Sequence, residues 1–238
     1  MQRRHYVLHE AAGAKAAGAK AKVFSNGIRD CHKDGSVLPE RLLSNGKGMR
    51  LADFVNAESA KAAELTEAEV AAIRLYSTAA FRSINNPLRD QERCGRGEAH
   101  PLPVTVTLIR DGLKKLRVVE LQGGSAANRT VDLYRGMAGM TLDAAFLTEG
   151  GTELAPMSTT ASLEVAMKYS ASASALLLRI RTESFMVRAP DISFLSAFPE
   201  EKEFLYPPLT YLKPEGKPQT LVVDDAAYTV VTVTPIMS

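Results

Sequence analysis

The sequence lacks tryptophan and is poor in the residues that build disulfides and metal sites, with two cysteines and four histidines among 238 residues. Cys31 and Cys94 are too few for a disulfide framework and are not in Cys-x-x-Cys spacing. His5 and His9 share an i, i+4 spacing, but they lie in an Ala/Gly/Lys-rich stretch without a third ligand. We therefore expect no metal and two free thiols, with a single bridge between the cysteines as the alternative.

Long apolar runs and a strong excess of one charge are also missing. No stretch approaches the ~18 consecutive apolar residues of a membrane span, and the basic N-terminus has no apolar core of a signal peptide. The formal net charge is +2, which creates no general attraction to nucleic acid or anionic membranes. We expect a monomer without a nucleic-acid partner or membrane span, either cytoplasmic or exported by a signal-independent route.

The first half of the chain has helical patterns. Residues 1–22 are predicted to be a flexible tail, and residues 23–238 one domain, with a helical lobe over about 23–128. Thr66-Glu-Ala-Glu69 is a capping box, and apolar residues at helical spacing follow it as far as Ile84, after which Asn85-Asn86-Pro87 is predicted to break the helix. A second helix is predicted through Leu108–Leu116, although the Val-Thr-Val-Thr before it also fits a strand.

The second half, about 129–238, is rich in predicted strands. Alternating side chains at 176–181 are typical of a half-buried strand, residues 160–169 fit a helix, and Asp224-Asp225 fits a turn. Helices followed by strands indicate an α+β fold rather than alternating α/β. The other predicted strands cover residues 132–135, 204–212, 221–224 and 228–234.

Several familiar catalytic motifs are missing from the sequence. It contains no phosphate-binding P-loop, no G-x-G-x-x-G after a strand and no G-x-S-x-G elbow. Three separated segments stand out instead, and each alone has an ordinary explanation as a surface turn, a helix cap or a solvated charge run. They are VDLYRGM with Arg135, APMSTT with Ser158-Thr159-Thr160, and PEEKEF with Glu201 and Glu203.

Together, in this order, the three segments resemble the arginine-specific mono-ADP-ribosyltransferases of the R-S-E class. That family has an Arg on its first core strand, then Ser-Thr-Ser, then Glu-x-Glu. The flanks LYSTAAFRSINNPLR and SAFPEEKEFLYPP also resemble the family, over about residues 60–235. Thr160 replaces the second serine but keeps a hydroxyl. The resemblance implies two packed, mostly antiparallel sheets behind an N-terminal helical lobe, with NAD as substrate and no metal.

The two carboxylates receive different roles. Breaking the bond between nicotinamide and ribose leaves an oxocarbenium-like centre, which a fixed carboxylate in a dry site stabilises. The resemblance gives this role to Glu203. Residues two apart on a strand point to the same side, so we expect Glu201 to face the same site. A guanidinium with a pKa above about 12 is a poor nucleophile, and Glu201 is expected to bind it and take its proton.

The remaining candidate residues contact NAD or the acceptor. Arg135 offers a fork of donors to the pyrophosphate, and Gly136 lets the backbone approach the nicotinamide amide. Ser158 is expected to orient Glu203 or the ribose. Thr159, counted among the NAD-binding residues, and Thr160 are expected mainly to brace the strand and cap the next helix. Residues 191–200 match the family's acceptor-recognition loop, which makes Phe198 a candidate contact with an arginine-bearing target protein or, alternatively, a buried loop anchor.

Three alternative functions remain at this stage. An NAD glycohydrolase would use the same donor-side residues with water as acceptor. A catalytically silent binding module would not need the set of Arg135, Ser158, Glu201 and Glu203. Transfer to DNA or another non-protein acceptor ranks lowest, because Glu201 is not Gln and no basic stripe is evident. The resemblance is equally compatible with a cytoplasmic enzyme and with a secreted effector.

Overall fold

The structure is a computed structural model that describes residues 41–46, 48–122, 131–140, 143–170, 175–182 and 187–237. The predicted tail, with His5 and His9, and Cys31 lie outside these residues. The chain divides into two compact units. The first ends at Val119 and also contains Ile192–Pro199, whereas the second contains Glu120–Asp191 and continues from Glu200. None of the helices in these ranges combines the length and apolar character needed to cross a membrane.

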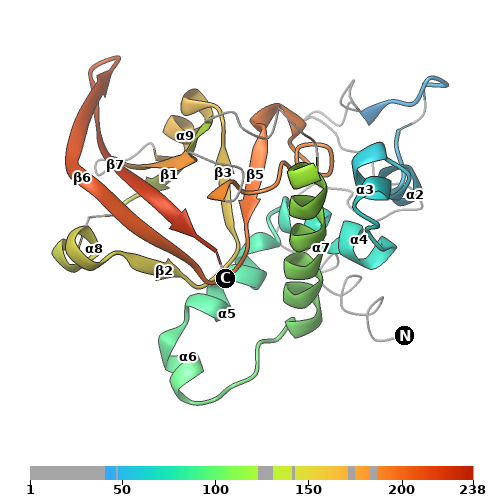
Figure 1. Ribbon diagram of the computed structural model, residues 1–238, viewed down its shortest axis with the longest axis horizontal. Helices are drawn as coiled ribbons and strands as arrows, with labels where there is room; N and C mark the ends of the chain where they lie inside the picture. Colours follow the sequence, from blue (N-terminus) through green and yellow to red (C-terminus); the bar gives the residue numbers. More distant parts are fainter. Residues whose placement is uncertain are drawn as a thin grey trace. The chain divides into compact units, whose positions relative to one another are not determined.

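Helices build the first unit (Figure 1). The predicted capping box is confirmed, because Thr66 Oγ1 accepts from the Glu69 N–H at 3.2 Å and Glu69 Oε2 accepts from the Thr66 N–H at 2.7 Å. Lys115 Nζ donates to the same carboxylate at 2.8 Å. The helices are α2 (Leu51–Val55), α3 (Glu58–Ala62), α4 (Glu67–Tyr76), α5 (Phe81–Arg89), α6 (Gln91–Gly95) and α7 (Pro103–Gln122), so the Val-Thr-Val-Thr segment is helical.

The end of α4 differs from the sequence prediction. The helix was expected to reach Ile84, but it ends at Tyr76, because Ser77 Oγ donates to the Arg74 carbonyl at 2.8 Å and Thr78 Oγ1 donates to the Leu75 carbonyl at 2.7 Å. Such side-chain bonds replace the backbone bonds that would continue a helix. Pro87 breaks no helix and lies inside α5. It removes one backbone bond to Ser83, whose exposed position gives that carbonyl access to water.

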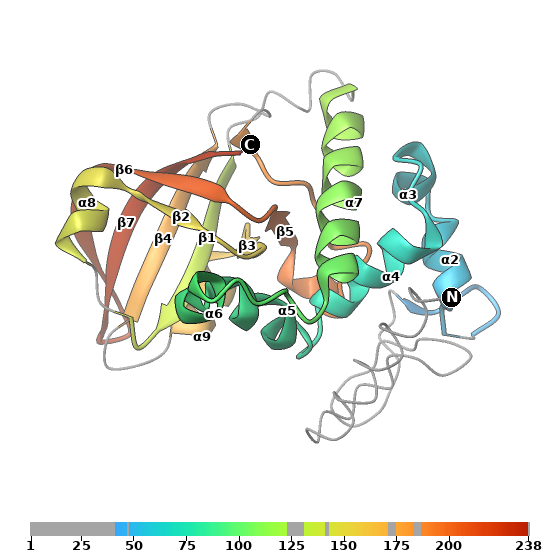
Figure 2. The ribbon, with the colours of Figure 1, turned by 90° about the horizontal axis from the view of Figure 1, so that it is seen from below.

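A seven-stranded sheet forms the second unit, in the order β2-β6-β7-β4-β1-β3-β5 (Figure 2). Every neighbouring pair is antiparallel except β4 and β7, which confirms a mostly antiparallel α+β core. Two helices, α8 (Ala144–Glu149) and α9 (Leu163–Ser170), belong to this unit. The strands are β1 (Val131–Ala138), β2 (Gly151–Glu153), β3 (Met157–Thr160), β4 (Ala175–Thr182), β5 (Glu203–Tyr206), β6 (Thr210–Val223) and β7 (Ala226–Ile236).

The sheet has its fewest paired residues between β1 and β3. Those two strands share one registered pair, Tyr134 with Thr160, whereas β1 and β4 are registered along their full length. The resemblance implied two packed sheets, and the structure joins all the strands in one hydrogen-bonded series through this single pair. The β1–β3 junction therefore separates β3 and β5 from the other five strands of the sheet.

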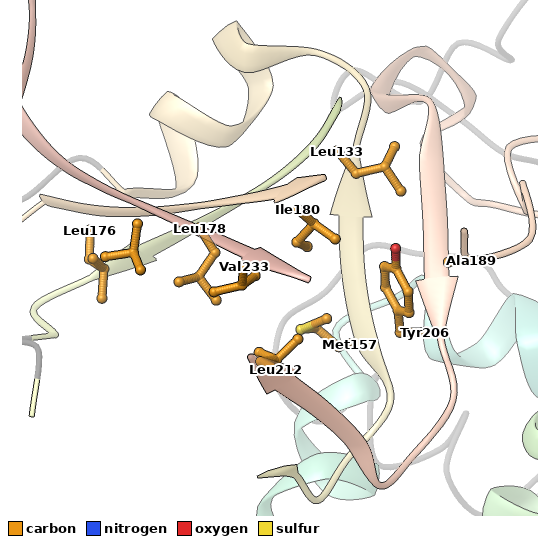
Figure 3. Close-up of a cluster of buried hydrophobic side chains, with 10 residues drawn as sticks. Leu133, Met157, Leu176, Leu178, Ile180, Ala189, Tyr206, Leu212 and Val233 are labelled. Atoms are coloured by element: carbon orange, nitrogen blue, oxygen red, sulfur yellow. The ribbon is translucent and has the colours of Figure 1, made fainter. Parts of the chain in front are cut away.

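Side chains of the strands form one buried apolar cluster (Figure 3). Burial of such side chains supplies most of the favourable free energy of folding. Nine of its residues lie on strands and Ala189 lies between β4 and β5. The strand residues are Leu133, Met157, Leu176, Leu178, Ile180, Tyr206, Leu212, Val231 and Val233.

The turn at Asp224-Asp225 is confirmed by positive φ angles of 47° and 62°, the left-handed values that tight hairpin turns use.

Helix α9 packs closely on the opposite face of β1, at Gly136. A Cβ atom added to this glycine would lie 1.9 Å from the carbonyl oxygen of Ala166 and 2.9 Å from the amide nitrogen of Ser170. Both contacts are with helix backbone, which cannot move aside as a flexible side chain can. Gly136 is therefore required for the approach of α9 to the strand that carries Arg135.

We expect Gly136→Ala to destabilise the protein by about 1–3 kcal/mol or more, because overpacking of this kind costs that much even where side chains can adjust. Urea denaturation followed by circular dichroism measures the change. Gly95→Ala in α6 is the matched control, since a Cβ atom there meets nothing within 4 Å. Equal stability of the two variants would contradict the packing role of Gly136.

Candidate functional site

The centre of the site is a hydrogen bond between β3 and β5. Ser158 Oγ donates to Glu203 Oε1 at 2.7 Å. Glu203 is the first residue of β5, pairs with Thr160 in the antiparallel register and is 7% exposed. Alternation along the two strands puts Ser158, Thr160 and Glu203 on one face. The bond fixes the orientation of a carboxylate that the strand already holds in a buried position.

Arg135 connects this pair to β1. Its Nη1 atom donates to the main-chain carbonyl of Ser158 at 2.9 Å. Ser158 therefore contacts Arg135 through its carbonyl and Glu203 through its hydroxyl. Both contacts lie beside the β1–β3 junction, where the two strands share one registered pair. The three residues proposed from sequence as Arg, Ser and Glu thus form one hydrogen-bonded chain across three strands.

Glu201 lies outside the strand, contrary to the sequence prediction that placed it two residues before Glu203 on the same β-strand. Pro199–Glu201 form a 3₁₀ turn, and Lys202 follows with a left-handed φ of 48°. A positive φ at a non-glycine residue turns the chain sharply, so strand alternation does not apply to Glu201. Thr160 Oγ1 holds this turn by donating to the Glu201 carbonyl at 2.5 Å.

Tyr169 is a residue that the sequence analysis missed. It lies near the end of α9, and its hydroxyl donates to Glu201 Oε1 at 2.8 Å. Desolvation of its hydroxyl, the hydrogen bond to Glu201 and the charges of Glu201, Glu203 and Glu200 raise the pKa of Tyr169, so the hydroxyl keeps its proton and stays a donor, although the residue as a whole is exposed. No sequence spacing predicts this bond, because it depends on where α9 and the 3₁₀ turn meet.

Burial also raises the pKa of Glu201. The Glu200 carboxylate adds to this rise, whereas the Tyr169 hydrogen bond and the charge of Lys168 oppose it. A raised pKa makes a carboxylate a stronger proton acceptor, which is the property required of a general base. The two glutamates are therefore in different settings, with Glu203 buried on a strand and Glu201 half-buried on a turn.

The two threonines after Ser158 have bracing contacts. Thr159 is 3% exposed and donates to the Phe204 carbonyl at 2.9 Å, on the face of β3 opposite Ser158. Thr160 holds the Glu201 turn and also accepts from the Ser162 N–H at 3.0 Å. The structure thus brings Ser158 to Glu203 but directs Thr159 away from them.

The loop that carries Phe198 belongs to the first unit and is held by two buried arginines that the sequence analysis also missed. Arg74 Nη1 donates to the Leu195 carbonyl at 2.7 Å, and Arg41 Nη2 donates to the Ser196 carbonyl at 2.7 Å. Both guanidiniums lie over the Phe54 ring, with the Cζ atom 5.2 Å from the ring centroid for Arg41 and 3.6 Å for Arg74. Phe198 itself is 45% exposed, which favours a surface contact over a buried anchor.

Histidine and cysteine have structural or surface positions in the described part of the chain. His100 accepts the Leu102 N–H at 2.9 Å through Nδ1, and its Nε2 lies 3.0 Å from the Ile84 carbonyl. Cys94 is an exposed free thiol on α6. Among the residues that the structure describes, no three His, Cys, Asp or Glu side chains are grouped to hold a metal ion.

Comparison with known proteins identifies the family of the chain. The family model for ADP-ribosyltransferase exoenzymes matches residues 53–233, whereas no curated protein matches the chain. Solved structures with TM-scores above 0.5 share the fold at identities between 12% and 21%.

Three of these structures cover most of both chains. HopU1 of Pseudomonas syringae is 21% identical, with a TM-score of 0.56 over 83% of this chain and 93% of that one. Plx2a of Paenibacillus larvae is 21% identical, with a TM-score of 0.56 over 78% and 94%. Vis of Vibrio splendidus is 18% identical, with a TM-score of 0.55 over 79% and 83%. Since the family match spans well over half of the sequence, the chain belongs to the ADP-ribosyltransferase exoenzyme family, whose enzymes use NAD as the source of ADP-ribose.

Proposed function

We propose that the protein transfers ADP-ribose from NAD to an arginine side chain of a target protein. The observation that carries the proposal is the different setting of its two carboxylates. Glu203 is buried and fixed by Ser158, whereas Glu201 is half-buried on a turn and has a raised pKa. A buried fixed charge suits bond cleavage in the donor, and an accessible base suits activation of an acceptor.

On the donor side, the bond between nicotinamide and the ribose C1′ breaks, and its electron pair leaves with nicotinamide. Positive charge then develops on the ribose, and Glu203 stabilises it while binding the ribose hydroxyls. Arg135 binds the pyrophosphate. A guanidinium has five N–H donors, so its bond to the Ser158 carbonyl is compatible with a phosphate contact. Thr159 has a bracing role in this scheme.

On the acceptor side, a guanidinium nitrogen forms a new bond to C1′ as nicotinamide departs. One proton must leave that nitrogen, and Glu201 accepts it. The exposed Phe198 is proposed to contact the target protein. Measurement of nicotinamide release with and without agmatine, a small guanidinium acceptor, tests the proposal directly. Nicotinamide release without labelling of agmatine or protein would instead indicate an NAD glycohydrolase.

We expect Glu203→Gln to lose both NAD hydrolysis and agmatine labelling by about 10²–10³-fold or more, the usual cost of removing one fixed electrostatic group. Both reactions pass through the same positively charged sugar. Nicotinamide release and labelling are measured on folded protein, with Glu149→Gln at the exposed end of α8 as the matched control. Near-native turnover of Glu203→Gln would reject Glu203 as the catalytic carboxylate.

We expect Glu201→Gln to lose agmatine labelling by at least about 10²-fold, the scale of general-base catalysis, while NAD hydrolysis stays measurable. The substitution keeps the shape and an accepting oxygen but removes the charge and the proton acceptor. Both activities are measured side by side on the same preparation. Equal loss of both would place Glu201 in the donor site, and no change in either would make it a solvated turn residue.

We expect Arg135→Lys to weaken NAD use more than it weakens folding, because lysine keeps the charge but loses the fork of donors. The KM for NAD and the thermal unfolding temperature are compared with those of Arg181→Lys on the neighbouring β4. An unchanged KM in the Arg135 variant would restrict this residue to bracing the β1–β3 junction.

A further inference from the structure

The contact between Tyr169 and Glu201 adds a residue to the acceptor side of the site. Tyr169 is 56% exposed, yet its hydroxyl makes a 2.8 Å hydrogen bond to the carboxylate oxygen Oε1. In the part of the chain that is described, this hydroxyl is the hydrogen-bond donor to the Glu201 carboxylate, and it uses one oxygen. The ring, mostly open to solvent, therefore lies beside a carboxylate that has a second oxygen to offer.

This bond acts on the carboxylate rather than on the path of the chain. The backbone of Glu201 is already held by the 2.5 Å bond from Thr160 Oγ1 to its carbonyl. A glutamate side chain has several rotatable bonds, and a single donor at its end selects one orientation and reduces the entropy lost on binding a ligand. A neutral hydroxyl does this without cancelling the negative charge, as a lysine or arginine partner would.

We infer that Tyr169 is a positioning residue of the acceptor site, where it orients Glu201 and offers its ring to the plane of the incoming guanidinium. The inference rests on the proposed arginine transfer and names the groups that would recognise the acceptor. Oε2 and the second lone pair of Oε1 accept guanidinium N–H donors. A tyrosine ring attracts a cation at its face, and the planar guanidinium also stacks on it.

The charges around the pair favour a cationic ligand. Glu200, Glu201 and Glu203 act on the Tyr169 hydroxyl, and Lys168 is the positive group that acts on Glu201. Lys168 also pairs with Glu164 at 3.1 Å on the exposed surface of α9. The three carboxylates near the Tyr169 hydroxyl suit a guanidinium ligand, and Lys168 and Lys202 are the basic residues of the same segments.

The test compares Tyr169→Phe with wild type. The variant keeps the ring and loses the hydroxyl, and we expect kcat/KM for agmatine to fall about tenfold, the scale of one hydrogen bond to a charged group. Nicotinamide release without acceptor should stay within about twofold of wild type, because Glu203 keeps its bond to Ser158. Tyr211→Phe is the matched control, since the Tyr211 hydroxyl donates to the Glu149 carbonyl on another part of the sheet.

The pH profile separates positioning from a merely structural role. The Tyr169 bond lowers the pKa of Glu201, so its removal raises that pKa further. Transfer needs the ionised carboxylate and is lost as pH falls through its pKa. We therefore expect the acid limb of agmatine transfer to move to higher pH in Tyr169→Phe. NAD hydrolysis should keep its acid limb, because it does not use Glu201 as a base.

Tyr169→Ala removes the ring as well, and we expect a further decrease of about two- to fivefold in kcat/KM for agmatine, the scale of an exposed cation–π contact. Unchanged transfer and an unchanged acid limb in Tyr169→Phe would overturn the inference and leave the proposed transfer intact. Equal loss of hydrolysis and transfer would also overturn it, by making Tyr169 a brace of the whole site. A wild-type protein that hydrolyses NAD but labels no guanidinium would reject the proposed function and this inference together.

Discussion

The candidate site depends on one residue, Ser158, which connects three strands where β1 and β3 share a single registered pair. Its hydroxyl bonds Glu203 on β5, and its carbonyl accepts from Arg135 on β1. β1 and β3 share a single registered pair there, so these side-chain bonds supply order where backbone pairing is sparse. We propose that the donor site is built around this junction, because Arg135, Ser158 and Glu203 meet there in one hydrogen-bonded chain.

The two glutamates differ in how the backbone holds them. Glu203 is held by the β-ladder, and Lys202, with its left-handed φ of 48°, ends the strand geometry before Glu201 is reached. Glu201 therefore takes its position from two side chains, Thr160 at its carbonyl and Tyr169 at its carboxylate. In the proposed mechanism Glu203, which acts on NAD, is held rigidly. The position of Glu201, which acts on the acceptor, can be changed by substitution at residues that do not contact NAD.

Sequence patterns predicted the parts of this architecture that have local causes. The capping box at Thr66 and the Asp224-Asp225 turn follow from chemistry within a few residues, and both are confirmed. The prediction that Glu201 lies on a strand was wrong, because a 3₁₀ turn and one positive φ leave no periodic pattern in the sequence. Tyr169 and the arginine anchors of the Phe198 loop were missed for a related reason: their partners lie between 32 and 155 residues away along the chain.

In the proposed mechanism Glu203 serves the donor and Glu201 serves the acceptor. A crystal structure with a non-hydrolysable carbocyclic NAD analogue and agmatine would test these two roles. We expect the hydroxyls of the nicotinamide ribose within about 2.6–3.2 Å of Glu203, the range of a productive hydrogen bond, and the guanidinium on the Glu201 carboxylate beside the Tyr169 ring. Ribose hydroxyls bound to Glu201, or an analogue bound away from β3 and β5, would contradict it.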